Sequence, residues 1–320
     1  MVRISIKEYL CRLLPQKRHF TGVDIRAGQI RVAEIKVTDG IPEVAALGMI
    51  PSPPGVWGDN LDEEALIQAL QEVLHPPHRE VITCIGAEKV VCRIVQLPRI
   101  SEKELWPVIK TEIQKYVPYP VSQLVIRYLW LGQVGEEIKS QKAGAPETAA
   151  GKVREGLLIL AVPLSIIYQY HGIFTRAGYT LTVVDLQALA LWRVFGRNTL
   201  GCTALVDVDR ENTLLVLINN GLISFTRLLP VGSKDPAGIA NELQRSLAYC
   251  GSEEQITVER LLLSGQVNGL DKINEFLHPS LGVDAEIGHP QINFVGDELY
   301  EPAYAVAVGL ALRGWWGGFV

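Results

Sequence analysis

The chain has 320 residues, 48% of them hydrophobic, which suffices for two domains or one large two-lobed domain with a substantial core. Its 30 lysines and arginines against 35 aspartates and glutamates give a formal charge of -5, which argues against nucleic acid as a partner. The five cysteines are odd in number and form no C-x-x-C pair, so they indicate neither a disulfide framework nor a zinc site but thiols in a reducing cytosol.

The N-terminal segment 1–19 is basic, with five lysines and arginines against one glutamate, and this +4 leaves -9 for the rest of the chain. Its apolar residues recur at helical spacing, so it is expected either to contact an anionic membrane surface or a partner, or to dock as a short helix on its own domain. No apolar run approaches the roughly 18 residues of a membrane-spanning helix, and no signal-peptide pattern is visible, so a soluble intracellular protein is expected.

Residues 20–51 predict three strands in two hairpins, because β-rich runs are separated by Arg-Ala-Gly and Thr-Asp-Gly turns. Residues 202–232 repeat this layout. Asp24 precedes Gly40 by 16 residues, and Asp207 precedes Gly221 by 14 residues. A repeat separated by about 180 residues predicts two similar halves, not a solenoid.

The region between the two units predicts a compact block. Two short strands are expected in 80–100, and Ser101 with Glu104 forms a capping box for a helix that runs toward Tyr116, kinked or restarted at Pro107. A strand at 124–132, a mobile polar loop and a buried strand at 157–163 follow.

Further along, an amphipathic helix at 165–179, a return strand at 180–185 and a helix from 186 capped by Asp185 are expected. The second half then predicts a helix at 239–250 closed by Gly251, a strand at 260–265, a helix near 269–277 and a last helix at 303–314. Strands and helices alternate in both halves, which predicts an α/β architecture with mixed sheets covered by helices. His75 and His78 have no further ligands nearby, so no metal site is expected.

The order and spacing of several segments resemble one family. The run VVCRIVQLPRISEKELWPVIKTEIQKYVPYP (90–120), AGYTLTVVDLQALALWR (177–193) and AVAVGLALRG (305–314) are similar to PilM, the actin-like protein of type IV pilus assembly and a relative of FtsA. The resemblance spans 20–314. It implies a two-lobed actin-like fold with subdomain 1A at 20–79, subdomain 1C at 80–180, a connecting helix at 181–200, subdomain 2A at 201–314 and an aromatic tail at 315–320.

The resemblance also implies a scaffold at the cytoplasmic face of the inner membrane. It would clamp the cytoplasmic N-terminal tail of a PilN-like single-pass membrane protein between subdomains 1A and 1C, and would contact other pilus assembly-platform proteins. The aromatic edge of 1C supplies the candidate groove residues: Trp106, Tyr116, Val117 and Tyr119. Taken singly, a tryptophan or tyrosine is more often found in the core than in a binding hot spot.

Members of this fold are expected to bind ATP between the lobes, but the cleft residues depart from the pattern. The set comprises Asp24, Arg26, Gln29, Asp207, Asp209, Thr213, Gly265 and Gln266. Each hairpin turn normally reads Asp-x-Gly because glycine lets backbone N–H groups approach a phosphate. Here Arg26 and Asp209 stand at the two glycine positions, Gln266 replaces the second glycine of a Gly-Gly pair, and subdomain 2B is reduced or missing. We therefore expect a pseudo-ATPase with no cofactor, although weak ATP-Mg binding stays open.

Two other functions are weighed. An active actin-fold ATPase or phosphotransferase would need a carboxylate base, for which Asp185 is conceivable, although a helix cap is the more natural interpretation of this residue. A filament-forming, FtsA-like membrane tether with self-association could use Trp315, Trp316 and Phe319 at a membrane interface. A tail folded on its own domain or on a partner subunit is preferred, because these few residues lack a basic face.

Overall fold

The computed structural model describes residues 19–56, 61–75, 79–132, 154–253, 256–266, 273, 275–277, 283, 285–295 and 300–316. The expectations for segment 1–18, the prolines of the 75–78 stretch, the polar loop and most of the helix near 269–277 lie outside these residues. Among the described residues the strands form three sheets of six, five and three strands.

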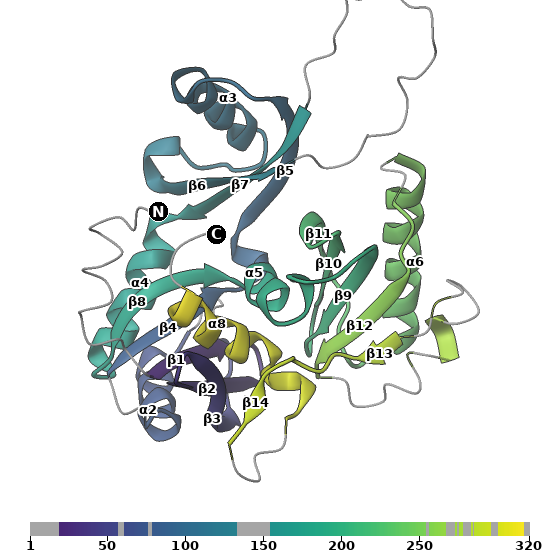
Figure 1. Ribbon diagram of the computed structural model, residues 1–320. Helices are drawn as coiled ribbons and strands as arrows, with labels where there is room; N and C mark the ends of the chain where they lie inside the picture. Colours follow the sequence, from purple (N-terminus) through teal and green to yellow (C-terminus); the bar gives the residue numbers. More distant parts are fainter. Residues whose placement is uncertain are drawn as a thin grey trace, which may run out of the picture.

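The six-stranded sheet has the order β14-β3-β2-β1-β4-β8, and all of its strands except β14 come from the first half of the chain (Figure 1). Its strands are β1 (His19–Ile25), β2 (Gln29–Thr38), β3 (Ile41–Pro51), β4 (Glu80–Ile85), β8 (Thr180–Leu186) and β14 (Asn293–Phe294). The second half forms the five-stranded sheet, in the order β11-β10-β9-β12-β13. Its strands are β9 (Cys202–Val208), β10 (Thr213–Asn219), β11 (Leu222–Leu229), β12 (Arg260–Gly265) and β13 (Ala285–Ile287).

The two large sheets share one topology. In each, three antiparallel strands are followed by two parallel ones, so that β3-β2-β1-β4-β8 corresponds to β11-β10-β9-β12-β13. The hairpins predicted from the turn residues are confirmed in both halves. The repeat visible in the sequence is therefore a repeat of structure.

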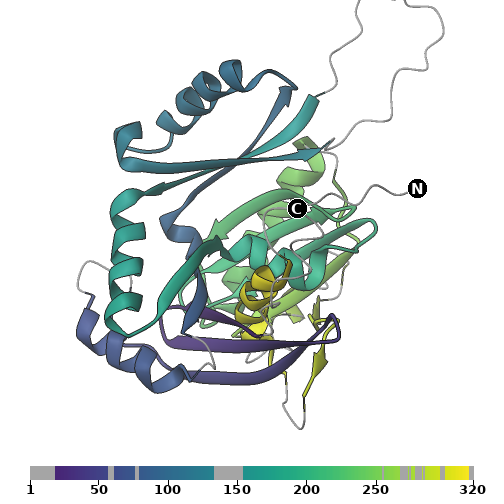
Figure 2. The same cartoon turned by 60° about the vertical axis from the view of Figure 1, so that its left-hand side comes forward.

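A smaller unit stands apart from these sheets (Figure 2). The strands β5 (Val91–Pro98), β7 (Arg154–Pro163) and β6 (Leu124–Gly132) form an antiparallel sheet, and helix α3 (Glu102–Gln114) packs on it through Leu105, Ile109 and Ile113. We call β5, α3, β6 and β7 the small-sheet unit. It is narrower than the 80–180 block expected from the sequence, because β4 pairs with β1 in the large sheet and helix α4 packs on the same core as β4.

The remaining helices cover the large sheets. They are α2 (Glu63–Val73), α4 (Leu164–Arg176), α5 (Gln187–Leu191), α6 (Pro236–Glu253) and α8 (Ala305–Trp316). A π-helical turn, η3 (Trp192–Gly196), extends α5, and short 3-10 turns are η1 (Ala87–Lys89), η2 (Val121–Gln123) and η4 (Pro302–Tyr304). Six residues separate β11 from α6, so the helical insertion of a 2B subdomain is absent at this point.

Two boundary expectations are wrong. Helix α6 does not stop at Gly251 but runs to Glu253. The connecting helix that the resemblance implied over 181–200 begins only at Gln187, because the strand expected at 180–185 is present as β8 and pairs in parallel with β4. Of the two alternatives at Pro107, α3 does not restart there but continues as one helix, with the hydroxyl of Thr111 donating to the Pro107 carbonyl (3.0 Å).

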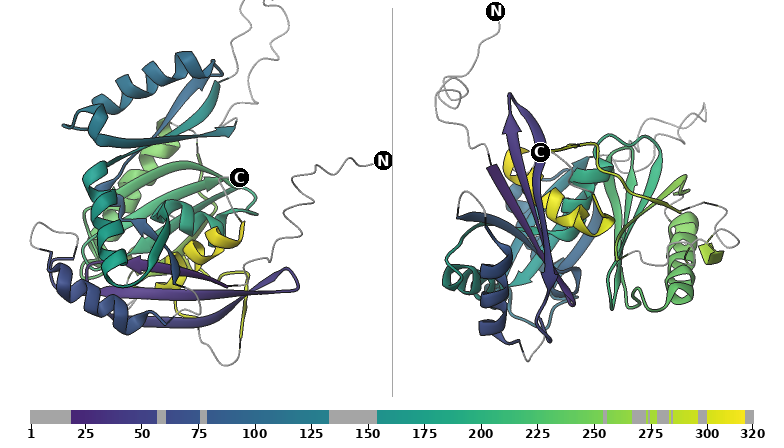
Figure 3. Two further views of the ribbon diagram at one scale, coloured as in Figure 1. Left: turned by 90° about the vertical axis from the view of Figure 1, so that its left-hand side faces the viewer. Right: turned by 90° about the horizontal axis from the view of Figure 1, so that it is seen from below.

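Helix α8 lies between the two halves, as the view from below in Figure 3 shows. It packs so closely on β1 that a Cβ added at Gly22 would lie 2.1 Å from the carbonyl oxygen of Ala307 and 2.6 Å from the amide nitrogen of Ala311. Only glycine fits there, because the obstacles are backbone atoms that cannot rotate away. Val306 and Leu310 on the same helix pack with β9 and β10 residues in a core shared by both halves.

We predict that Gly22→Ala lowers the free energy of unfolding by about 1–3 kcal/mol, because the methyl group forces α8 away from β1. The matched control is Gly172→Ala in α4, where an added Cβ has open space. This control should raise stability by about 0.5–1 kcal/mol through the lower backbone entropy of alanine. Urea unfolding followed by far-UV circular dichroism measures both, and equal effects of the two changes would contradict the close packing at Gly22.

Candidate functional site

Equivalent turns of the two halves face each other at one end of the large sheets. Asp24 and Asp207 each occupy the second-last position of the strand that opens the hairpin, β1 or β9. The turns close in the same way, since Arg26 N–H donates to the Gln29 carbonyl (3.1 Å) and Asp209 N–H donates to the Asn212 carbonyl (2.8 Å). Arg26 and Asp209 therefore occupy corresponding positions with opposite charges.

Arg26 joins the two halves. Its Nε lies 2.9 Å from Asp24 Oδ2, and its Nη1 lies 2.5 Å from Asp207 Oδ2. All three side chains are buried, with Arg26 8% exposed. A guanidinium group thus occupies the space between two carboxylates that come from different hairpins.

Both carboxylates have further partners. Asp24 accepts from Arg31 Nη1 (3.3 Å), and the Cys84 thiol lies 3.9 Å from it. Burial raises the pKa of the Cys84 thiol well above its usual value, so this group stays a protonated donor. Asp207 accepts from Gln187 Nε2 (2.7 Å) and from Ser264 Oγ (2.6 Å). Neither carboxylate can take a metal ion without breaking a buried ion pair or hydrogen bond.

The charged groups in this cluster shift one another's pKa values. Burial opposes the charge of Arg26, but attraction to Asp207, Asp24 and Asp209 raises the pKa of Arg26 well above its usual value. Burial raises the pKa of Asp209, although Arg26 and the backbone N–H of Arg210 favour its charged form. Asp209 Oδ1 has no hydrogen-bond partner among the described residues. Arg26 is thus held charged, while Asp209 bears an uncompensated cost of burial.

The segment at Gly265 and Gln266, the third one predicted to border the cleft, also connects the two halves. Gly265 has φ +82°, and a Cβ there would lie 2.1 Å from the Val208 carbonyl oxygen, so this position requires glycine. Gln266 N–H donates to the same carbonyl (2.7 Å), and its side-chain amide reaches Gln29 Oε1 of the other half (3.4 Å). The glutamine at the second glycine position therefore bridges the two halves.

Two cavities remain around this bridge. A cavity of about 210 Å³ borders Asp24, Arg26, Cys84 and Asp209. A second cavity, of about 650 Å³, lies beyond Gln29 and Gln266 and is lined by Arg210 and Lys234, among others. The carboxylate end of the cleft is thus narrowed by its own side chains, whereas the other end stays open.

Seven of the eight predicted cleft residues contact one another or line these cavities. The exception is Thr213, which is fully buried and donates its hydroxyl to the Val231 carbonyl (2.8 Å), so it ties β10 to the end of β11. Sequence reasoning missed Arg31, Gln187 and Ser264. Arg31 stands opposite Asp24 in the β1–β2 register, a signal that the predicted hairpin contained.

Asp185 neither caps a helix nor faces the cleft as a base. It lies in β8, where its carboxylate accepts from the Leu186 N–H (2.8 Å) and pairs with Arg193 Nη1 (2.6 Å). Leu186 takes the N-cap position of α5. Burial lowers the pKa of Arg193 despite the attraction of Asp185. The cap preference was overridden because the strand continues and a buried arginine requires a counter-ion.

The predicted groove aromatics are exposed and not in the core. Trp106, Tyr116 and Tyr119 retain 40%, 44% and 48% of their accessible surface, while Val117 packs against the core of the small-sheet unit. Core burial, the commoner fate of such residues, is therefore wrong for these three. Of the four, Tyr116 alone lines the cavity between β5 and β11 described below.

The C-terminal aromatics fold back on the chain as far as the structure describes them. Trp315 and Trp316 pack against the cluster that contains Phe20, and Arg197 lies over the Trp316 ring (4.5 Å). Phe319 lies outside the described residues. Within the described ranges no helix is long and apolar enough to cross a membrane, and no group of three or more histidine, cysteine or acidic side chains could hold a metal ion.

Comparisons with known proteins identify the fold. No family model matches the chain. The PilM-PilN type IV pilus biogenesis complex is similar with a TM-score of 0.76 and 21% identity, over 94% of this chain and 99% of that one. The cytoplasmic domain of EpsL, an inner membrane component of the type II secretion system of Vibrio cholerae, matches with a TM-score of 0.51, 13% identity and coverages of 94% and 96%. A Bacteroides thetaiotaomicron protein of unknown function with an actin-like ATPase fold matches with a TM-score of 0.51 and 8% identity, over 84% of this chain and 91% of that one. The predicted two-lobed actin-like fold is confirmed.

We predict that Arg26→Ala lowers the free energy of unfolding by about 3–5 kcal/mol, because it leaves buried carboxylates of both halves without their shared cation. The control is Arg245→Ala on α6, where an arginine with 74% side-chain exposure pairs with Glu242. That change should cost no more than about 1 kcal/mol. Comparable losses in urea unfolding of the two variants would show that the bridge adds nothing beyond a surface ion pair.

We predict that Asp209→Asn stabilises the protein at pH 7. Because the folded-state pKa of Asp209 is raised, the native state binds its proton more tightly than the unfolded chain does. Wild-type stability contributed by this residue is therefore lost as the pH rises from the unfolded-state pKa of about 4 through the folded-state pKa. The advantage of the variant in urea unfolding should shrink as the pH is lowered toward 4, and a constant difference would contradict the raised pKa.

Proposed function

We propose that this chain is a scaffold of a type IV pilus or related secretion assembly platform at the cytoplasmic face of the inner membrane. Its partner would be the cytoplasmic N-terminal tail of a PilN-like single-pass membrane protein. The similarity over nearly the full length of both chains to the PilM-PilN complex carries this proposal, and the similarity to EpsL extends it to secretion systems.

We further propose that the chain is a pseudo-ATPase. The bridge of Arg26 between Asp24 and Asp207 supports this, because a phosphate or Mg²⁺ ion could enter that space only after Arg26 leaves two buried carboxylates. An acidic side chain at the second glycine position adds repulsion: Asp209 would oppose a phosphate by about 4 kcal/mol at 4 Å and an effective dielectric of 20. The same bridge argues against a phosphotransferase, since Asp24 and Asp207, the carboxylates at the two turns, are already paired with Arg26.

The tail would bind on the small-sheet unit. Trp106 on α3 and Tyr119 beyond it are exposed, although large aromatics usually bury, and exposed aromatics concentrate binding energy when a partner covers them. Lys110 lies over the Trp106 ring (5.4 Å), so the indole is oriented without being covered. This surface belongs to the unit that lies outside the duplicated core.

Calorimetric titration with a synthetic peptide that covers the tail of the PilN-like partner tests both parts. We expect the peptide to bind, ATP-Mg titrated alone to give no micromolar binding, and saturating ATP-Mg to leave the peptide affinity unchanged. A ligand that does not bind cannot shift a coupled equilibrium. Micromolar ATP-Mg binding would overturn the proposal of a pseudo-ATPase. Failure of the peptide to bind would overturn the proposal of a PilN-like partner.

Trp106→Ala should weaken the binding of the tail peptide by about tenfold or more, as expected for a hot-spot aromatic. Tyr168→Ala on α4 removes an aromatic that is 67% exposed and lies outside the predicted groove, so it is the matched control.

A further inference from the structure

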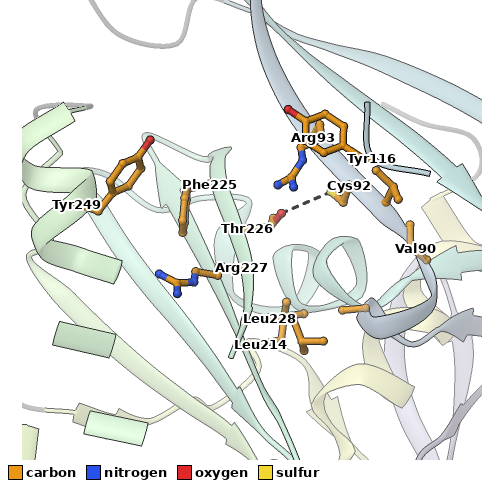
Figure 4. Close-up of a pocket in the computed structure, with 12 residues that line it drawn as sticks. Val90, Cys92, Arg93, Tyr116, Leu214, Phe225, Thr226, Arg227, Leu228 and Tyr249 are labelled. Carbon is orange, nitrogen blue, oxygen red and sulfur yellow. Dashed lines mark hydrogen bonds between the residues drawn. The ribbon is translucent and has the colours of Figure 1, made fainter. Parts of the chain in front are cut away.

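Apart from the two cavities near the Arg26 bridge, a third cavity separates the small-sheet unit from the second half of the chain (Figure 4). Its volume of about 650 Å³ falls within the range of ligand-binding sites. Val90 to Arg93 and Tyr116 line one side, and Phe225 to Leu228 and Tyr249 line the other. One hydrogen bond crosses it, from the Thr226 hydroxyl to Cys92 Sγ (3.4 Å).

The lining pattern places this cavity at strand edges, not on a sheet face. Successive side chains of a strand point to opposite faces. Consecutive residues of β5 and of β11 border the cavity, so it must wrap around the edge of each strand. Among the described residues β5 pairs only with β7 and β11 only with β10, so each is the outermost strand of its sheet.

A strand edge offers unpaired backbone N–H and C=O groups. An occupant that satisfies them needs its own alternating donors and acceptors, which an extended polypeptide has. Small anions or apolar molecules would leave most of these groups without partners. The main-chain chemistry of both walls therefore selects a peptide strand.

The side chains specify its character. Arg93 and Arg227 are both exposed at the cavity, and none of the described residues that line it is acidic. Arg93 lies over the Tyr116 ring (4.3 Å), while Arg227 is held by Ser246 (3.1 Å) and Glu242 (3.4 Å). Tyr249 is 53% exposed and lines the same cavity as Phe225, so the cavity offers apolar surface as well as positive charge (Figure 4).

We propose that this cavity binds an extended segment of a partner protein that carries acidic and aliphatic residues on one face, at positions i and i+2, and that the segment adds as a strand to the outer edge of β11. Its backbone pairs with the strand edge, its carboxylates meet Arg93 and Arg227, and its apolar side chains contact Phe225 and Tyr249. The site does not include Trp106 or Tyr119 of the surface proposed for the membrane partner, shares only Tyr116 with the predicted groove residues, and does not depend on that partner.

Fluorescence polarisation with short fluorescein-labelled peptides tests this. The probes are a peptide with aspartate and leucine at successive positions of one face and threonine on the other face, a copy with lysine for aspartate, and a copy N-methylated at alternate residues. We expect the acidic peptide to bind at least about tenfold more tightly than the lysine copy, because of charge complementarity. We expect N-methylation to weaken it by at least about tenfold, because strand addition depends on main-chain hydrogen bonds.

Arg93→Glu should weaken the acidic peptide by at least about tenfold and leave unfolding unchanged, since Arg93 is exposed. Lys36→Glu, a charge reversal at an exposed residue of β2 that does not line the cavity, is the control and should leave binding unchanged. Absence of binding, or equal binding of acidic and lysine peptides, overturns the proposed site. Undiminished binding of the N-methylated copy overturns strand addition. A concentration-dependent dimer in sedimentation that Arg93→Glu dissociates would assign the cavity to a second copy of the chain and overturn the partner.

Discussion

Arg26 places one buried positive charge between carboxylates that belong to different halves of the chain. Burying three charged groups is costly, and the cost is recovered only when each charge keeps its counter-ion and its remaining hydrogen bonds. Gln187 at the start of α5, Ser264 in β12 and Arg31 in β2 complete those bonds. Where the two turns meet, the relative position of the two halves therefore depends on the guanidinium group of Arg26.

One glycine of the cleft is required by the backbone itself. Gly265 has positive φ, and a Cβ there would collide with Val208. Arg26, Asp209 and Gln266 stand where the resemblance led us to expect glycine, and the side chains of Arg26 and Gln266 reach the opposite half. The fold needs Gly265 whether or not a ligand binds.

The sequence predicted the duplicated hairpins because turn residues and alternating apolar strands are local signals. It also placed Asp24, Arg26, Asp207 and Asp209 at the turns. It could not indicate Gln187 or Ser264, because they reach Asp207 from elements whose packing is set by the tertiary fold. Asp185 was misassigned because capping preference is a local tendency and its ion pair with Arg193 is not. The exposure of Trp106 was likewise beyond local pattern, since an amphipathic helix does not indicate what its outer face will meet.

Arg26 and Asp209 occupy the same place in the two copies of a duplicated turn, and their charges are opposite. Removal of Arg26 would leave the buried carboxylates of Asp24 and Asp207 without their shared cation, whereas removal of the Asp209 charge leaves Arg26 with both of its counter-ions. The two copies of the duplicated turn are therefore unequal in consequence. The first copy holds the two halves together, and the second can change its side chain without loosening that connection.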